Sequence, residues 1–308
     1  MAFWTDVYQD FGDYSIILPP EPYVFGCSHI RPREVPAHIA RPFYASTNSE
    51  AQSPSGSVPS RKLIPLGGDE EKGLRAAAGL AKRVREFAGS LVKVGATTNE
   101  IDEQLHAFII ENGAYPSPLL YSGFPRSCCT SINNIMVHGI PDDRPLESGD
   151  IINIDITIFF NGYHGDTSQT FLVGKVDSQG QELVGITNRA LEAGIQACKP
   201  GAPFKAIGKA MYGVIRDKDF SISPQFTGHG IGSEFHRPPW ILHHLNDEPG
   251  VMQPGDCFTI EPCIVQGSNP RAWIFPDGWT ASSENCARSA QAEHMVLITE
   301  TGVEVLTQ

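Results

Sequence analysis

An internal repeat places the strongest constraint on how this 308-residue chain can fold. When residues 199–224 are aligned under residues 93–118, an offset of 106 residues, seven of the 26 columns are identical, which is far more than chance gives. A helix, a Gly-Ala turn, a second helix and then strands occur twice. We therefore predict an α+β fold of two duplicated halves about a pseudo-twofold axis. The helices would cover one face of a shared antiparallel sheet, leaving the other face for chemistry. Two similar but independent helical hairpins are the alternative.

The helices themselves are marked by apolar periodicity. From Asp69 to Leu91, apolar residues recur every three or four positions, which predicts an amphipathic helix. A second helix is predicted to follow, because Thr97 and Glu100 have the spacing of a capping box. Gly113 stands where a left-handed residue is expected to end that helix.

Residues 1–68 differ from the rest of the chain. They are rich in proline and carry a serine-rich stretch at 46–60, so an irregular extension is predicted. Aromatic residues such as Trp4, Tyr14 and Tyr44 indicate that this extension packs on something. We therefore predict an N-terminal extension over 1–68 that packs on a main domain over 69–308.

Composition argues against several classes of function. No apolar run approaches the roughly 18 residues that a membrane helix needs, so a membrane partner is not expected. The net charge of −12 would repel a phosphate backbone, so nucleic acid is not expected as a partner either.

Cysteine usage and the first twenty residues bear on the compartment. The seven cysteines form no CxxC pair, which predicts free thiols in a reducing compartment rather than disulfides or a zinc ribbon. The first twenty residues contain three aspartates and no Lys or Arg, unlike a signal or transit peptide. As the chain stands, a cytoplasmic location is expected. A mitochondrial or other organellar location is the alternative if a transit peptide has been removed.

A predicted hairpin brings two carboxylates onto one face. Isoleucines alternate through 151–159, and Asn161-Gly162 is a strong signal for a two-residue hairpin loop. The resulting register puts Asp155 and Asp166 on the same face in diagonal positions, with Cβ atoms within roughly 7–8 Å. Two carboxylates at that distance could share a metal ion. A solvated polar hairpin face is the alternative.

Three later residues strengthen the metal hypothesis. His229 lies between glycines, Glu261 lies in an apolar strand context, and Glu293 lies on another strand whose next residue, His294, should face the opposite way. Four converging carboxylates would repel one another strongly, and two divalent cations would balance their charge. Oxygen donors with one imidazole suit Co, Mn, Fe or Zn, and such a dinuclear site performs hydrolysis.

The combined motifs resemble those of the type I methionine aminopeptidases, in metallopeptidase family M24. The matching stretches are HGIP (138–141), NIDITIFFNGYHGDTSQTF (153–171), GHGIGSEFH (228–236), FTIEP (258–262) and SAQAEH (289–294). The resemblance implies a pita-bread fold for residues 69–308, which would be the catalytic domain. Asn133-Asn134 and the proline-rich leader look more like the organellar eukaryotic branch.

The resemblance also implies roles for individual residues. The metal ligands would be Asp155, Asp166, His229, Glu261 and Glu293, holding two divalent ions. Asp166 and Glu293 would bridge the ions, Asp155 would chelate the second, and His229 and Glu261 would hold the first. Glu261 would also accept a proton, His236 would bind the scissile carbonyl oxygen, and His138 would contact the amide nitrogen or the leaving amine.

A methionine side chain needs an apolar, polarisable pocket. By resemblance, the substrate-binding residues are Pro118, Tyr121, Phe124, Cys129, His138, Phe235, His236 and Trp279. Val137 departs from the family, where cysteine commonly precedes the histidine; the volume is kept, so activity should persist. His164 is interpreted as a residue behind the ligands, and His243, His244 and Cys128 as structural.

The activity implied is removal of the initiator methionine from nascent proteins when the second residue is small. An Xaa-Pro aminopeptidase of the same fold is one alternative, and a non-catalytic pita-bread binding protein is another, although all five ligands are present. The partners expected are nascent polypeptide N-termini, with the ribosome left open. The protein is expected to be a monomer.

Overall fold

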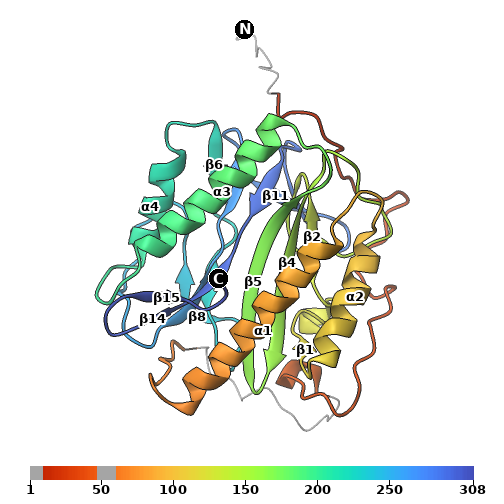
Figure 1. The fold of residues 1–308 in the computed structure, drawn as a ribbon. Helices are drawn as coiled ribbons and strands as arrows, with labels where there is room; N and C mark the ends of the chain where they lie inside the picture. The colour runs from red at the N-terminus through yellow and green to blue at the C-terminus, as the bar shows by residue number, and fades with distance from the viewer. Residues whose placement is uncertain (1–9, 47–59) are drawn as a thin grey trace.

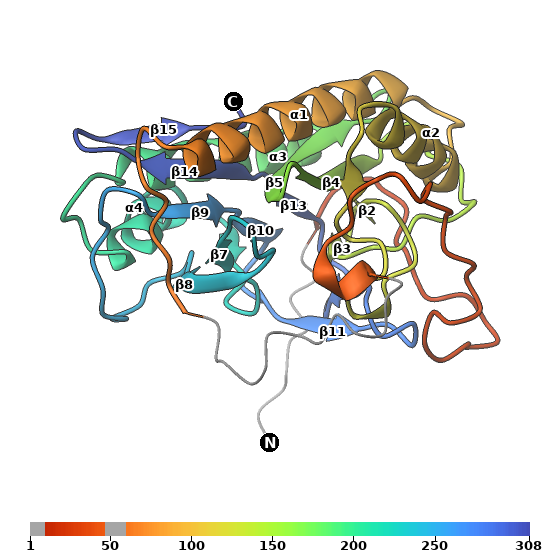
Figure 2. The ribbon, with the colours of Figure 1, turned by 90° about the horizontal axis from the view of Figure 1, so that it is seen from below.

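The computed structural model describes residues 10–46 and 60–308, and within them four α-helices cover an array of short strands. Figure 1 shows α1 running along the β4–β5 hairpin, and Figure 2 shows α1, α2 and α3 on one side of the strands. The α-helices are α1 (Asp69–Leu91), α2 (Thr98–Glu111), α3 (Ser178–Gln196) and α4 (Lys205–Ile215); the short 3-10 helices are η1 (Phe43–Ala45) and η2 (Tyr121–Gly123).

The internal repeat corresponds to the two helix pairs. In each copy a helix, a turn with a left-handed glycine (Gly95 or Gly201) and a second helix are followed by a short strand. Ile101 of α2 and its aligned partner Ile207 of α4 are both fully buried. The predicted α+β class and its duplicated halves are therefore confirmed.

The single shared sheet predicted from the sequence is divided. Among the described residues, the paired strands form four antiparallel sheets, and one of these sheets pairs strands from both halves of the chain. The first contains β1 (Tyr115–Pro116), β2 (Cys129–Ile132), β4 (Ile151–Phe160) and β5 (Tyr163–Leu172). The second contains β6 (Phe220–Ile222), β10 (Cys263–Gln266) and β13 (Ser289–Gln291), and the third contains β3 (Ile135–Val137), β11 (Ala272–Ile274) and β12 (Ala281–Ser283). The fourth contains β7 (Gly228–Gly230), β8 (Arg237–Ile241), β9 (Cys257–Ile260), β14 (His294–Ile298) and β15 (Val303–Val305).

The β4–β5 hairpin has the predicted register. Asp155 pairs with Ser168 and Thr157 pairs with Asp166. Asn161 and Gly162 have φ values of 52° and 88°, as a two-residue hairpin loop with both residues left-handed requires. The alternating isoleucines of β4 are buried in one apolar cluster with α1 and α2, so the polar face of the hairpin points away from these helices.

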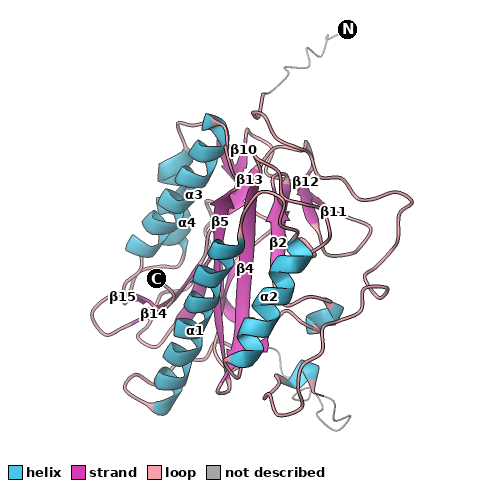
Figure 3. Ribbon diagram, turned by 45° about the vertical axis from the view of Figure 1, so that its right-hand side comes forward, coloured by secondary structure: helices cyan, strands magenta, loops and turns pink. Residues whose placement is uncertain are grey.

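The described residues 10–46, here called the N-terminal strap, contain only the 3-10 helix η1 and otherwise run as loop along the side of α2 (Figure 3). Hydrogen bonds fix the strap to the rest of the chain. Tyr14 donates its hydroxyl to the carbonyl of Cys286 at 2.6 Å, and Ile17 exchanges two backbone hydrogen bonds with the side chain of Asn134. Trp4, Tyr8 and most of the serine-rich stretch lie outside the described residues. Within the described ranges, the helices are too short or too polar to span a bilayer.

Backbone contact between α1 and β5 yields a test of the fold. A Cβ atom on Gly165 would lie 2.4 Å from the carbonyl oxygen of Ala77, whereas a Cβ on Gly79 of α1 would have no neighbour within 4 Å. We expect Gly165→Ala to lower the free energy of unfolding by about 1–3 kcal/mol through overpacking. Gly79→Ala should raise it by about 0.4–1 kcal/mol, because it restricts the unfolded chain without a clash.

Urea denaturation of both variants and the wild type, at equal metal loading, measures the difference. Equal changes in the two variants would show that β5 does not depend on this close approach.

Candidate metal centre and active site

A cavity of about 280 Å³ lies on the polar face of the β4–β5 hairpin. It is lined by every side chain that the sequence singled out for metal or substrate binding: Pro118, Tyr121, Phe124, Cys129, His138, Asp155, Asp166, His229, Phe235, His236, Glu261, Trp279 and Glu293. The structure therefore brings together residues from both halves of the chain in one cavity.

The five candidate ligands come from two of the four sheets and from connections next to strands. Asp155 and Asp166 lie on β4 and β5, and His229 lies on β7. Glu261 follows β9 directly, and Glu293 lies between β13 and β14. An isolated bridge between Ser168 and Glu293 joins the first half of the chain to the second at this point.

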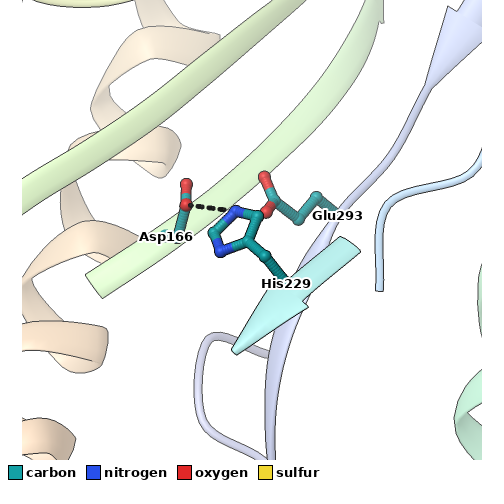
Figure 4. A group of neighbouring side chains, drawn as sticks. All are labelled: Asp166, His229 and Glu293. Atoms are coloured by element: carbon teal, nitrogen blue, oxygen red, sulfur yellow. Dashed lines mark ion pairs between the residues drawn. The ribbon is translucent and has the colours of Figure 1, made fainter. Parts of the chain in front are cut away.

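Three of these ligands form a compact group (Figure 4). One ligand atom each from Asp166, His229 and Glu293 lie within 4.8 Å of one another. His229 Nε2 is 3.7 Å from Asp166 Oδ2 and 3.5 Å from Glu261 Oε1. Asp155 lines the same cavity outside this group. These three side chains could hold a metal ion between them.

Glycines on both sides of His229 allow β7 to approach its neighbours. A Cβ atom on Gly228 would lie 2.3 Å from the carbonyl oxygen of Thr259, and one on Gly230 would lie 2.4 Å from that of Pro238. Any larger residue at either position would push β7, and with it the imidazole, away from the carboxylates.

The electrostatics of the cluster favour a bound cation. Burial raises the pKa of Asp155 to about 7 and that of Glu261 to about 8. Burial and the neighbouring carboxylates raise the pKa of Asp166 and of Glu293 well above the usual range. Burial lowers the pKa of His229 to about 4, so its ring is neutral and can donate a lone pair. A divalent cation would relieve the repulsion and keep all four carboxylates charged.

Side chains that the sequence reasoning missed hold Glu261 in place. Thr259 donates its hydroxyl to Glu261 Oε1 at 2.7 Å, and Gln291 Nε2 donates to Oε2 at 3.2 Å. The backbone N–H of Glu261 donates to His243 Nε2 at 3.1 Å, so His243 has a supporting place beside the site. Thr259 and Gln291 each lie two residues before a candidate ligand, Glu261 or Glu293, and strand alternation could have found them.

The apolar part of the cavity is built from aromatic rings. The rings of Tyr121 and Phe235 lie 4.9 Å apart, and those of Phe124 and Trp279 lie 5.1 Å apart. Burial raises the pKa of Cys129 well above the ordinary value, so its thiol is neutral. These residues form an apolar slot beside the carboxylates.

Two candidate catalytic histidines lie at the border between this slot and the carboxylates. His236 Nδ1 is 2.9 Å from the hydroxyl of Tyr121, and the rings of His236 and His229 lie 4.2 Å apart. His138 has a left-handed backbone with φ of 59°, and its ring lies 6.1 Å from that of Trp279.

Two other histidines lie outside the cavity. His164 is buried behind Phe235, with Nδ1 2.8 Å from the Ser117 hydroxyl, as its place behind the ligands predicted. His294 contacts Arg85 and Thr307 on the other side of the strand, as strand alternation predicted.

Comparison with known proteins identifies the family. The sequence model of metallopeptidase family M24 matches residues 72–300. Methionine aminopeptidase 1D, chloroplastic/mitochondrial, from Arabidopsis thaliana is 49% identical over 278 residues, which cover 90% of this chain and 77% of the relative. Methionine aminopeptidase 1D, mitochondrial, from Homo sapiens is 47% identical over 297 residues, covering 96% of this chain and 84% of the relative.

A solved structure of a methionine aminopeptidase is also similar to this chain. The crystal structure of methionine aminopeptidase from Rickettsia prowazekii superposes with a TM-score of 0.78 at 38% identity, covering 80% of this chain and 100% of that one. The chain therefore belongs to metallopeptidase family M24. Its activity within that family is that of a methionine aminopeptidase, so the Xaa-Pro and non-catalytic alternatives are set aside.

The buried carboxylates predict how pH affects the metal-free protein. Asp155 and Glu261 bind protons more tightly in the folded state, with pKa values of about 7 and about 8, than in the unfolded chain. Stability is therefore greatest below the unfolded pKa and is lost as pH rises through the folded values. The buried histidines act in the opposite sense, but their effect is constant above their ordinary pKa of about 6.5. Asp166 and Glu293, whose pKa values are also raised, act in the same sense as Asp155 and Glu261. Between about pH 6.5 and 8.5, the free energy of unfolding should therefore fall by at least roughly 1 kcal/mol per pH unit.

Urea denaturation of chelator-treated protein across this range measures the slope. Asp155→Asn should make the slope shallower. The control Asp143→Asn, which changes an exposed aspartate, should leave the slope unchanged. If the free energy of unfolding of the wild type stayed constant or rose with pH over this range, the clustering of buried carboxylates would be contradicted.

Proposed function

We propose that Asp155, Asp166, His229, Glu261 and Glu293 hold two divalent cations, and that the protein uses them to remove the initiator methionine from nascent chains whose second residue is small. The observation that carries this proposal is that all five side chains line one cavity together with an apolar aromatic slot.

The donor set fits a dinuclear site. Four carboxylates and one neutral imidazole offer a total charge that two divalent cations would balance. Hard oxygen donors with one imidazole accept Co, Mn, Fe or Zn. When bound, such cations lower the pKa of water and polarise a carbonyl group.

Glu261 is the side chain placed to accept and return the proton of the attacking water. Its two oxygens are held by Thr259 and Gln291, so the carboxylate is oriented before substrate arrives. A carboxyl group whose pKa is raised to about 8 by burial can exchange a proton near neutral pH.

His236 would donate a hydrogen bond to the scissile carbonyl oxygen. Burial lowers its pKa well below the usual value, so the ring is neutral. With the Tyr121 hydroxyl donating to Nδ1, the proton of the ring stays on Nε2, where it can stabilise the developing oxyanion. His138, also neutral because burial lowers its pKa to about 4, would contact the amide nitrogen or the leaving amine.

The preference for a small second residue has a steric basis. One cavity of about 280 Å³ must contain the cations, the methionine side chain and the scissile bond, which leaves little room for a second large side chain. Val137 lines this cavity beside His138 and adds an apolar surface where the family commonly has cysteine.

For the compartment, we propose an organelle, with nascent polypeptide N-termini as partners and the monomer as the active form. The organellar location is supported by the names of the two relatives, which are mitochondrial and chloroplastic proteins. Contact with the ribosome remains an open prediction, and the net charge of −12 argues against nucleic acid itself as a partner.

Replacement of Glu261 tests the catalytic proposal. Glu261→Ala should lower kcat for Met-Ala-Ser by at least ~10³, because it removes both a ligand and the proton acceptor. Glu284→Ala, which changes an exposed glutamate paired with Arg271, serves as the control and should keep normal turnover. Near-normal turnover by Glu261→Ala would refute the role of Glu261. Faster cleavage of an Ala-Pro peptide than of Met-Ala-Ser by the wild type would refute the preference for methionine.

Metal content tests the ligand set separately from turnover. After equilibration with Mn²⁺ and desalting, the wild type should retain two ions per chain by elemental analysis, and His229→Ala at most one. His38→Ala changes an exposed histidine of the strap and should retain two. Equal metal content in all three proteins would remove His229 from the ligand set.

A further inference from the structure

The N-terminal strap reaches the methionine slot from behind. Tyr44, in η1, donates its hydroxyl to the backbone carbonyl of Ser117 at 2.6 Å. Its ring packs edge-on against the ring of Tyr121, with centroids 5.0 Å apart and an interplanar angle of 81°. Tyr44 does not line the cavity, so it acts on the slot through its neighbours, of which Tyr121 is the one that lines the slot.

Tyr121 has two tasks in the site. Its ring forms a wall of the slot against Phe235, and its hydroxyl lies 2.9 Å from His236 Nδ1. A displacement of this one ring would therefore widen the slot and release the histidine at the same time.

The segment that carries Tyr121 makes backbone hydrogen bonds of its own, such as those between Leu120 and Phe124 and between Tyr121 and Phe124, yet its backbone has an unusual conformation. Leu120 and Ser122, on either side of it, have left-handed φ values of 66° and 46°, which are unfavourable for residues with a Cβ. Such a conformation persists only where surrounding contacts impose it. Among the described contacts, the strap supplies two: the ring of Tyr44 and a hydrogen bond from Cys27 Sγ to the carbonyl of Gly123 at 3.4 Å.

A third strap contact supports the opposite wall of the slot. The backbone N–H of Gly26 donates to the carbonyl of Pro276 at 2.9 Å, three residues before Trp279. The strap thus touches the chain segments that carry both the Tyr121 wall and the Trp279 wall.

We propose that Tyr44 is a positioning residue for this aminopeptidase: through it, the N-terminal strap holds Tyr121, and so holds His236 and the wall of the methionine slot in their working places. The inference rests on the proposed role of His236, and the experiment below separates the two.

The chain offers a matched control for Tyr44. Tyr14 is also a strap tyrosine whose hydroxyl donates to a backbone carbonyl at 2.6 Å, that of Cys286, and the guanidinium of Arg288 lies 4.6 Å from its ring centroid. Tyr14 does not line the catalytic cavity. Tyr14→Ala should therefore loosen the strap without releasing Tyr121.

The test compares steady-state cleavage of Met-Ala-Ser by Tyr44→Ala, Tyr44→Phe, Tyr14→Ala and the wild type, each shown by urea denaturation to be folded at the assay temperature. Tyr44→Ala should lower kcat/KM by at least about 30-fold, with KM raised and kcat lowered, because both the slot and His236 are affected. Tyr44→Phe keeps the ring and should stay within about threefold of the wild type, as should Tyr14→Ala. Equal losses in Tyr44→Ala and Tyr14→Ala would overturn the proposal and leave the strap a stabilising element only.

A double-mutant cycle isolates the hydroxyl link. In Tyr121→Phe the bond to His236 is already absent, so adding Tyr44→Ala should lower kcat little further while still raising KM. Additive losses in kcat would contradict the coupling. His236→Ala reports on the underlying mechanism: if it retains normal kcat, the proposed role of His236 fails, whereas if it is inactive and Tyr44→Ala is normal, only the positioning role of Tyr44 fails.

Discussion

Repulsion among four carboxylates in one cavity is the interaction on which the rest of the structure depends. Asp155, Asp166, Glu261 and Glu293 face a common space, and their pKa values are raised because burial removes the water that would stabilise their charge. The fold must supply enough packing elsewhere to hold them there, and a hydrolytic centre needs them charged. Bound divalent cations resolve that conflict, so the strain of the metal-free cavity and the chemistry of the loaded one have the same origin.

The architecture delivers these side chains by placing the site between the β4–β5 hairpin and the sheet that contains β7 and β9. The helices bury the isoleucine face of β4 and leave its aspartate face free. β7, β9 and β14 belong to one sheet of the second half, and the bridge between Ser168 and Glu293 brings the segment before β14 against the hairpin. Glycines beside His229 then permit backbone contact where a side chain would intrude.

The sequence predicted local features well because they have local causes. Strand alternation and the Asn161-Gly162 loop determined the hairpin register, and the resemblance to a known family supplied all five candidate ligands. Neither the sequence patterns nor the resemblance predicted the contact of Tyr44 with Tyr121 or the division of the sheet. Both features depend on contacts between distant segments, which leave no periodic pattern in the sequence. The irregular backbone around Tyr121 has no local signature either, because Leu120 and Ser122 are not residues that favour left-handed conformations.

The two halves of the repeat contribute unequally to the centre. The first supplies Asp155 and Asp166, and the second supplies His229, Glu261 and Glu293. Cations held by all five would therefore cross-link the halves without any covalent bond, and their binding energy would be available only to a chain in which both halves have docked. The catalytic ions would thus also stabilise the contact between the two halves across the pseudo-twofold axis. Depletion of metal would therefore weaken that contact before it affected the packing within each half.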